Sequence, residues 1–591
     1  MLPRLFILAW LFAQPISAAG WSPSSAPCAP TGVIADCPVA SHADRPYAIF
    51  RPSNHVVSVA TPVVLVLHGG NGNSNSGIDM SCASGQRSDS SCWHSVAERY
   101  GFVLAIPNGT RTSSGSAQRQ WNAGGGTSGW QCVGAQACVS AVDDVAYIRA
   151  VLGDLERWMH IDRRAVFATG LSNGAALAHR LACEMADALT AIAPVGGGNQ
   201  FEATRACAPV RPVAVLGIHG TADPCWTFDE SSTTCLGAVV GRKVGIRETM
   251  ANWAQRHGCS ASRERSEFPR DGDGIFSVET QWDGCAAPVR LLQIRGAGHT
   301  YPDGRQYLSA DAIGPTARDW GADRVFGFFA SVAGLQERLT GLWYVPGQDG
   351  WGLSITRQGD VLFPAWFTYS ESGRPIWFLV PGATRQADGS YAGQLLRFTG
   401  TPFANIAAVP ASLGSTAVGD ARFFSPAEGE LSFSYRIGGV EQTRSMRRLS
   451  PGPEPICLMG QGSSTGSRNA SDFWWTPSEP GWGLYLSESD GRIFLSWYSY
   501  ASDGEPMWVV GLLTRSHQGS YRGSLQGAQR GTPFAAITGP ATTFPLPDIG
   551  EAELRFDDGA RGQFEYTMDG SSRSTRIERF VFAGPPQSTC I

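Results

Sequence analysis

The C-terminal part of the chain carries the same pattern twice, and this duplication constrains the fold more than any other feature. Trp366-Phe-Thr-Tyr369 recurs as Trp497-Tyr-Ser-Tyr500, and Gly350-Trp-Gly352 recurs as Gly481-Trp-Gly483, each 131 residues later. A constant offset over about a hundred residues indicates a duplication. Short aromatic segments between Gly, Asp and Pro turns are typical of antiparallel strands. We therefore expect two all-β repeat units, 339–450 and 471–591, joined by a Pro-, Gly- and Ser-rich linker over 451–470.

Before residue 339 the pattern is different, because short apolar runs alternate with helical periodicity. Val63–Leu67 and Ala165–Ala168 predict buried strands, and apolar residues three and four apart over Asn173–Met185 predict a helix. The other predicted strands are Phe102–Ile106, Val213–Gly217 and Val289–Ile294, and the other predicted helices are Asp144–Trp158, Arg242–His257 and Ala317–Val332. Alternating strands and helices are typical of parallel sheets covered by helices. We predict an α/β fold class with a mostly parallel sheet over residues 20–338.

The first 19 residues have the order of a secretory signal. Arg4 supplies a positive charge, Leu5–Phe12 is an apolar run, and Ser17-Ala18-Ala19 offers small residues for cleavage. The apolar run is too short to cross a bilayer, and no later stretch reaches that length. We expect a secreted protein without a membrane span.

The 14 cysteines support an oxidising compartment. Their loose spacing, without flanking histidines, argues against zinc and for disulfides. Spacing does not determine connectivity, and our hypothesis is that neighbours pair. The resulting pairs are Cys28/Cys37, Cys82/Cys92, Cys132/Cys138, Cys183/Cys207, Cys225/Cys235, Cys259/Cys285 and Cys457/Cys590.

Charge excludes several classes of function. The formal net charge is −5, so nothing suggests a nucleic-acid or anionic-membrane partner. Lys243 is the single lysine, and no Gly-rich loop is followed by Lys and Ser or Thr, which excludes a P-loop nucleotide site.

The pattern Gly-x-Ser-x-Gly occurs twice, in different contexts. At 462–466 it lies in the expected linker, with no strand before it and no helix after it, so this match is accidental. At 170–174 it follows a predicted strand and opens a predicted helix. This is the context of a nucleophile elbow, in which small residues flank a serine on a tight turn. Ser172 is the predicted nucleophile.

A serine nucleophile needs a base and an orienting acid. Asp223 lies on a loop after one predicted strand, and His299 lies in a Gly-rich loop after another. Alone, Asp223 could be a turn residue and His299 a surface histidine. Together with Ser172 they have the order Ser, Asp, His, and we predict a catalytic triad.

The oxyanion of acyl transfer also needs backbone N–H donors. Asn173 follows the nucleophile directly and supplies one. The loop after Val63–Leu67 reads His68-Gly-Gly-Asn-Gly72, where glycine lets the backbone approach a substrate closely. We predict Gly70 as the second donor.

A series of motifs in this order resembles the secreted esterase family of polyhydroxybutyrate depolymerases and feruloyl esterases, over residues 46–332. The motifs are His68-Gly-Gly, Gln120-Trp121-Asn122-Ala123-Gly124, Asp143-Asp144-Val145, Gly170-Leu-Ser-Asn-Gly174, Ala191-Ile-Ala-Pro-Val195, His219-Gly-Thr-Ala-Asp223 and Gly298-His299-Thr-Tyr-Pro302. The resemblance implies an α/β-hydrolase with Ser172, Asp223 and His299 as triad and no metal. We predict no cofactor, and Trp121 and Trp226 as substrate-binding residues.

This sequence departs from the family pattern at two places. Gly69-Gly70-Asn71 stands where many relatives carry a cysteine after His-Gly, and residues 74–93 look like an inserted loop. Both departures bear on substrate choice.

Two hypotheses of function follow. The first is a secreted serine esterase whose partner is a polymeric ester, either a feruloylated glycan or a polyhydroxyalkanoate. The second is a binding or adhesive protein in which the repeats act and the hydrolase is vestigial; the intact Ser–Asp–His order favours the first.

The repeats resemble an aromatic Gly-Trp-x-Gly module of exported bacterial proteins, and they are the possible contact with a polymer surface. We expect Trp351 and Trp482, on tight turns, to be exposed ligand contacts. Trp366 and Trp497, inside alternating runs, should lie in the core.

Overall fold

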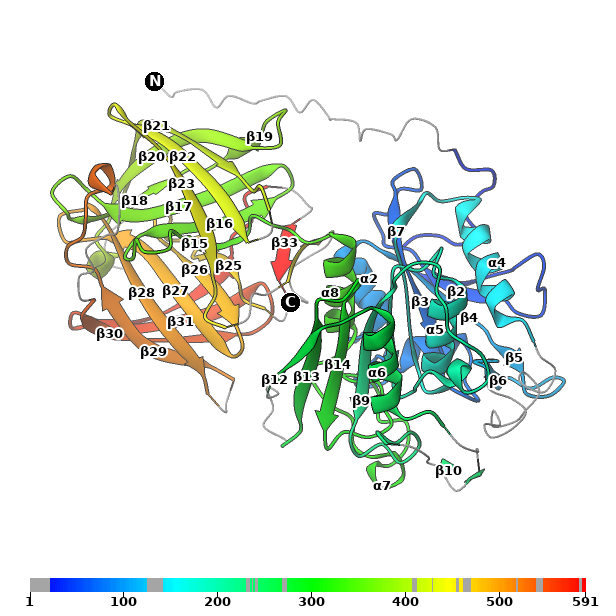
Figure 1. Cartoon of the computed structure of the whole chain (residues 1–591). Coiled ribbons are helices and arrows are strands. Elements are labelled where there is room, and N and C mark those ends of the chain that lie inside the picture. Colours follow the sequence, from blue (N-terminus) through cyan, green and yellow to red (C-terminus); the bar gives the residue numbers. More distant parts are fainter. Residues whose placement is uncertain are drawn as a thin grey trace.

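The chain forms a helix-covered sheet followed by a pair of β-barrels, as the computed structural model shows (Figure 1). The structure describes residues 22–124, 142–229, 234–235, 238–239, 243–267, 274–406, 412–427, 429–452, 456–460, 469–516, 519–537, 546–583 and 587–590. The signal segment and the Cys132/Cys138 pair lie outside these residues. Within the described part, no helix has the length and apolarity needed to cross a membrane.

The N-terminal sheet has ten strands in the order β1-β2-β4-β3-β7-β8-β9-β14-β13-β12. Their bounds are Ile34–Cys37, Tyr47–Phe50, Val103–Pro107, Thr61–Leu67, Ile161–Leu171, Ala191–Val195, Ala214–Gly220, Val289–Arg295, Phe276–Asp283 and Ala261–Glu267, in that order. The central strands are buried on both faces, which explains their continuous apolar runs. The five strands expected from the sequence are present.

Helices cover both faces of this sheet. On one face α4 (Asp144–Glu156), α5 (Asn173–Glu184) and α6 (Ile246–Arg256) pack in one apolar core. On the other face α2 (Trp93–Tyr100) and α8 (Ala322–Ala333) pack in a second core. The shorter helices α1 and α7 are Ser74–Asp79 and Ala310–Ile313, the 3-10 helix η1 is Gln200–Ala203, and the short strands β5, β6, β10 and β11 are Thr110–Arg111, Arg119–Gln120, Thr234–Cys235 and Ala238–Val239.

The predicted fold class is wrong for the chain as a whole. The structure is 42% strand and 15% helix, and its large sheet is mixed rather than mostly parallel. Parallel pairing is confined to the centre, from β4 to β14, whereas β1 and β2 at one edge and β12 and β13 at the other pair antiparallel. The five strands expected from the sequence all lie in the parallel centre, and none of the four antiparallel edge strands was among them.

The two repeats fold as eight-stranded antiparallel rings with equivalent strands. The first ring is β15 (Gly341–Tyr344), β16 (Gly352–Gln358), β17 (Val361–Tyr369), β18 (Pro375–Leu379), β20 (Tyr391–Gly400), β21 (Leu413–Phe424), β22 (Glu430–Ile437) and β23 (Val440–Leu449), with β19 (Ala383–Arg385) beside β17 and β20. The second is β25 (Asp472–Trp475), β26 (Gly483–Ser489), β27 (Arg492–Tyr500), β28 (Pro506–Arg515), β29 (Tyr521–Gly527), β30 (Asp548–Phe556), β31 (Arg561–Met568) and β32 (Ser571–Arg579). Two all-β units were expected, and both are present.

The barrels contact each other through reciprocal bonds related by the same offset. The Trp377 indole donates to the carbonyl of Ser499 at 2.9 Å, and the equivalent Trp508 indole donates to that of Thr368 at 3.0 Å. An apolar cluster that includes Phe367, Trp377 and Trp508 fills the interface. The two repeats therefore make the contacts of a two-fold dimer within one chain.

Each repeat also inserts a short 3-10 helix into the other repeat's barrel. From the second repeat, η4 (Phe534–Ala536) places Phe534 in the core of the first barrel beside Trp366. From the first repeat, η2 (Phe403–Asn405) places Phe403 against Trp497 of the second barrel. The barrels have exchanged these plugs, so neither core is made by one repeat alone.

The expected exposure of two turn tryptophans is wrong. Trp351 and Trp482 are only 4% and 6% exposed, because each turns its indole into its own barrel and packs against Trp366 or Trp497. Trp366 and Trp497 are buried in the cores, as predicted.

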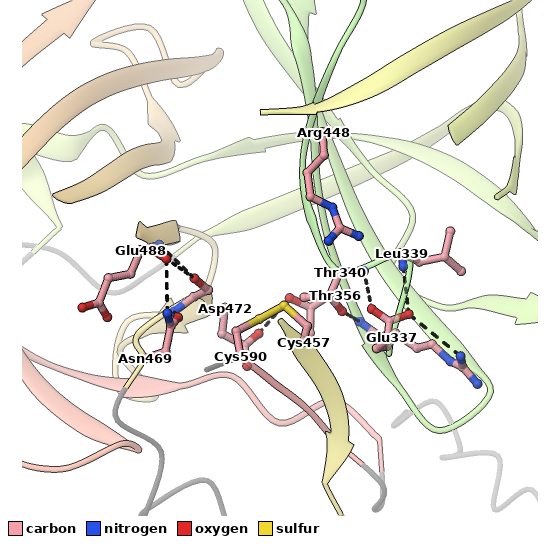
Figure 2. The surroundings of a disulfide bond; sticks show 12 residues. Glu337, Leu339, Thr340, Thr356, Arg448, Cys457, Asn469, Asp472, Glu488 and Cys590 are labelled. Atoms are coloured by element: carbon pink, nitrogen blue, oxygen red, sulfur yellow. Dashed lines mark hydrogen bonds and ion pairs between the residues drawn. A yellow bond between two sulfur atoms is a disulfide. The ribbon is translucent and has the colours of Figure 1, made fainter. Parts of the chain in front are cut away.

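A disulfide-linked strand pair connects the barrels with the N-terminal sheet. β24 (Cys457–Gly460) falls in the expected linker and pairs with β33 (Gln587–Cys590), with Cys457 bonded to Cys590. Figure 1 shows strand β33 between the two parts, and Figure 2 shows the disulfide. β33 also pairs with the barrel strand β16, while Leu458 is buried in the core below α2 and α8. Five further disulfides match the neighbour hypothesis, namely Cys28–Cys37, Cys82–Cys92, Cys183–Cys207, Cys225–Cys235 and Cys259–Cys285.

The exchanged plugs predict that a substitution in one repeat loosens the other. Phe534→Ala should lower the free energy of opening of the first barrel by ~3 kcal/mol, because it leaves a cavity beside Trp366. Hydrogen exchange read by mass spectrometry should show faster exchange in β17 and β18 than in β27 and β28. Phe424→Ala, at a side chain that is 43% exposed, is the matched control. Faster exchange confined to the second barrel would contradict the exchange of plugs.

Candidate active site

Ser172 occupies a strained position between strand β7 and helix α5. Its φ of 58° and ψ of −115° lie in a region that non-glycine residues rarely adopt. Two bonds hold it there, because its N–H donates to the carbonyl of Val195 at 2.9 Å and its carbonyl accepts from Ala176 at 3.0 Å. The hydroxyl is thereby presented at the end of the strand, before the first turn of the helix.

The glycines on either side of Ser172 are required by close packing. A Cβ on Gly170 would lie 2.6 Å from the carbonyl oxygen of Leu67, and one on Gly174 would lie 2.3 Å from the same atom. The start of α5 thus rests directly on the end of β3. This contact explains both glycines of the motif and brings the loop after β3 beside the serine.

Asp223 and His299 form a buried pair on the loops that follow β9 and β14. The His299 Nδ1 lies 2.6 Å from Asp223 Oδ2, while Oδ1 accepts the backbone N–H groups of Cys225 and Trp226 at 2.7 and 2.8 Å. Burial alone would raise the pKa of Asp223, but the adjacent His299 and these hydrogen bonds lower it. An ionised Asp223 keeps the proton on Nδ1, which leaves Nε2 free to accept one.

Gly196 lies between the serine elbow and the Asp–His pair. A Cβ there would lie 3.3 Å from His299 Nδ1, 3.5 Å from Asp223 Oδ2 and 3.4 Å from the side chain of Leu171. Gly196 therefore contacts both members of the Asp–His pair and Leu171, the residue that precedes Ser172. Within the described part of the chain, no hydrogen bond joins the Ser172 hydroxyl to His299; such bonds often tighten only when substrate binds.

The loop after β3 approaches the same serine. A Cβ on Gly69 would lie 3.8 Å from the Ser172 Cβ, and one on Gly70 would lie 3.7 Å from the Asn173 Cβ. Asn173 is the first residue of α5, so its N–H has no acceptor within the helix and lies at the positive end of the helix dipole. The two residues predicted as oxyanion donors are neighbours.

His68 orients this loop. Its Nε2 accepts the N–H of Gly109 at 3.0 Å, so the proton lies on Nδ1, which donates to the carbonyl of Gly69 at 2.8 Å. In a trans peptide the C=O and the following N–H point in opposite directions. Fixing the Gly69 carbonyl on His68 therefore turns the Gly70 N–H away from the histidine. Burial lowers the pKa of His68 to about 4, which keeps the ring neutral above that pH.

The two predicted substrate-binding tryptophans are both buried. The Trp121 indole donates to the carbonyl of His68 at 2.9 Å, and the Trp121 backbone exchanges two hydrogen bonds with the Asn173 amide. The Trp226 indole donates to the carbonyl of Val244 at 2.8 Å. Trp121 therefore supports the loop after β3, and Trp226 packs next to Asp223. The contact of these two side chains with substrate stays a prediction.

His219 is a second histidine that lies near the candidate acid. His219 donates to the Trp226 carbonyl and lies 3.6 Å from Asp223 Oδ2. Among the described residues, the one group that could offer metal ligands is Asp223, Cys225 and His299. The Cys225 sulfur is bonded to Cys235 and lacks a thiolate. Gly196 was not among the site residues predicted from the sequence, because its one sequence signal is a run of three glycines.

Comparison with known proteins finds esterases that are similar to part of this chain. No family model matches the chain. The probable feruloyl esterase C of Aspergillus oryzae is 27% identical over 266 residues, which are 44% of this chain and 78% of that protein. The feruloyl esterase C of Emericella nidulans is 31% identical over 177 residues, 30% of this chain and 56% of that protein. The chain spans about half the length of several curated relatives.

One solved structure, an acetyl xylan esterase from Aspergillus awamori, aligns with 46% of this chain and 94% of its own. Its sequence is 16% identical and the TM-score is 0.30, which does not establish a common fold.

Replacing either of two helical glycines by alanine should change the stability of the N-terminal domain, in opposite directions. Gly174→Ala should destabilise the N-terminal domain by several kcal/mol, because its methyl group would meet the Leu67 carbonyl at 2.3 Å. Gly153→Ala, inside α4 with no atom within 4 Å of the new Cβ, should stabilise by up to ~1 kcal/mol. Thermal unfolding of the two variants measures both effects. A neutral Gly174→Ala would show that the elbow does not rest on β3.

Proposed function

We propose that the protein is a serine carboxylic ester hydrolase that works through an acyl-enzyme. The proposal is supported by the buried Asp223–His299 pair and by the Ser172 elbow, which holds φ at 58° against the loop after β3; Gly196 contacts the pair on one side and Leu171 of the elbow on the other. Similarity to feruloyl esterases over part of the chain supports it.

In the acylation step, the Ser172 hydroxyl attacks the ester carbonyl carbon and its proton passes to His299 Nε2. Asp223 holds the ring through Nδ1 and stabilises the imidazolium that forms. The N–H groups of Gly70 and Asn173 bind the oxyanion, and Asn173 adds the favourable end of the α5 dipole. Collapse of the tetrahedral intermediate expels the alcohol, which takes the proton from His299.

In the deacylation step, water replaces the alcohol. His299 removes a proton from the water as it attacks the acyl carbon, and the same N–H donors bind the second oxyanion. The proton then returns to the Ser172 oxygen as the acid leaves. A neutral His68 keeps the Gly69–Gly70 peptide oriented through both steps, because burial lowers its pKa to about 4.

We propose a polymer-linked ester of the feruloyl type as substrate. The support is the similarity to proteins named feruloyl esterase C, one of which is aligned over 78% of its length. Export of the protein is part of the proposal, and the order of residues 1–19 and the six disulfides support it.

The barrel pair is proposed to hold the enzyme on its polymer. Since Trp351 and Trp482 are buried, the contact must come from side chains on the outside of the barrels. Among the described residues of the barrels, the large apolar side chains that are exposed are Leu413, Phe424, Leu512 and Val581. Tethering raises the local concentration of substrate without any new contact at the catalytic residues.

The nucleophile assignment predicts a large and specific loss. Ser172→Ala should lower kcat on p-nitrophenyl acetate by about 10⁴-fold or more, because the oxyanion donors alone leave only residual catalysis. Ser464→Ala, in the second Gly-x-Ser-x-Gly sequence, is the control and should be unchanged. Equal loss in the two variants would contradict the assignment.

The proposed substrate class predicts a preference between two esters. The protein should hydrolyse methyl ferulate and release little acid from a polyhydroxybutyrate film. Chromatography of the released acids, with Ser172→Ala as the blank, measures both reactions. Faster hydrolysis of the film would overturn the feruloyl proposal while leaving the ester hydrolase intact.

A further inference from the structure

Lys243, the single lysine of the chain, is buried behind the candidate catalytic acid. Its side chain is 6% exposed, its ammonium donates to the carbonyl of Cys225, and it lies 5.1 Å from the centroid of the Trp226 ring. Burying an ammonium is costly unless it is paired and hydrogen-bonded. A side chain that served only to fill this space could be apolar, so the charge needs a reason.

The contacted carbonyl belongs to the peptide that also binds Asp223. The Cys225 carbonyl and the Trp226 N–H are two ends of one peptide unit, and this N–H donates to Asp223 Oδ1 at 2.8 Å. An ammonium on the carbonyl polarises the peptide and strengthens the N–H as a donor, because hydrogen bonds in a chain reinforce one another. The positive charge thus acts on the carboxylate through the peptide.

A second contact holds the same turn against the segment that carries the lysine. The Trp226 indole donates to the carbonyl of Val244, the residue after Lys243, and the Cys225–Cys235 disulfide fastens the turn on its other side. The orientation of the Asp223 carboxylate therefore depends on residues 243–244.

We propose that Lys243 is a positioning residue, whose charged ammonium holds the Cys225–Trp226 peptide so that Asp223 stays ionised and aimed at His299. The effect of Lys243 on catalysis rests on the proposed hydrolase function. The hydrogen bonds from which its positioning role is argued are independent of that function.

The charge of Lys243 should be lost at mildly alkaline pH. Burial lowers its pKa to about 8, and the Asp223 carboxylate only partly opposes this. That carboxylate is also contacted by His219 from β9 and by His299 from the loop after β14. Activity should therefore fall above pH 8. The free energy of unfolding should instead rise with pH over the same range. The unfolded lysine keeps its proton to about 10.5, so the folded form binds fewer protons there.

The titration can be read without any mutation. Because the chain has one lysine, labelling with ¹³C,¹⁵N-lysine gives a single side-chain NMR signal that needs no assignment. We expect a midpoint near pH 8. A midpoint at the ordinary lysine value would place the ammonium in water and overturn the proposal.

The positioning role is tested with Lys243→Met and Lys243→Arg. The methionine removes the charge at similar length, and kcat on p-nitrophenyl acetate at pH 7 should fall about 10- to 100-fold with little change in KM, the loss expected for a hydrogen bond to a charged group. Arginine should restore most of the activity and move the alkaline limb upward, because it stays protonated. Arg247→Met, at a side chain 67% exposed in an ion pair with Asp229, is the control and should be unchanged.

A readout that needs no turnover separates this proposal from the proposed function. The His299 Nδ1–H bonded to Asp223 should give a far-downfield proton NMR signal in the wild type, and Lys243→Met should broaden or shift it, whereas Lys243→Arg should preserve it. An unchanged signal and an unchanged pH profile in the methionine variant would overturn the positioning role. A wild type inactive on every ester, with the signal still dependent on Lys243, would overturn only the hydrolase.

Discussion

The arrangement of the candidate site depends on one close contact, in which the start of α5 rests on the end of β3. Strands β3 and β7 run parallel with Leu67 opposite Gly170, so the two strands end side by side. Nothing larger than glycine fits at Gly170 or Gly174 against the Leu67 carbonyl. The chain must therefore turn sharply at Ser172, and the loop after β3 must pass beside Asn173. Ser172, the two predicted oxyanion donors and His68 are brought together by this single contact.

The acid side of the site is held by desolvated polar groups rather than by packing. Asp223 is buried, accepts two backbone N–H groups and faces His299, and the same turn is bound by Lys243 and by a disulfide. Burial strengthens each of these bonds and also makes each unpaired group costly. An apolar residue at position 243 would make the protein more stable than the buried lysine does. A residue that costs stability in this way is usually one that serves function.

The C-terminal half shows how a duplication can become one structural unit. Each repeat supplies a barrel and a plug, and each plug enters the other barrel, so the contacts are those of a swapped dimer fixed within one chain. The strand pair of the Cys457–Cys590 disulfide (Figure 2) then links this unit to the N-terminal sheet, because Leu458 is buried in that sheet's core. The glycine-rich turns bury their tryptophans because the barrel interior is the apolar surface within reach.

Much of this protein could be predicted from the sequence alone. Local periodicity identified five of the central strands and four helices, a fixed offset identified the repeats, and pairing each cysteine with its neighbour in chain order identified the six described disulfides. The periodicity, the offset and five of these disulfides depend on residues close together in the chain or on a repeated pattern; Cys457 and Cys590 are 133 residues apart. The candidate residues Ser172, Asp223 and His299 came from their positions after predicted strands. Tertiary structure alone decided which segment covers which surface: the antiparallel edges, the exchanged plugs, the burial of Trp351 and Trp482, and the contact of Lys243 with the Asp223 turn. A sequence shows that a face is apolar or that a charge is present, but the partner that buries it comes from a distant part of the chain.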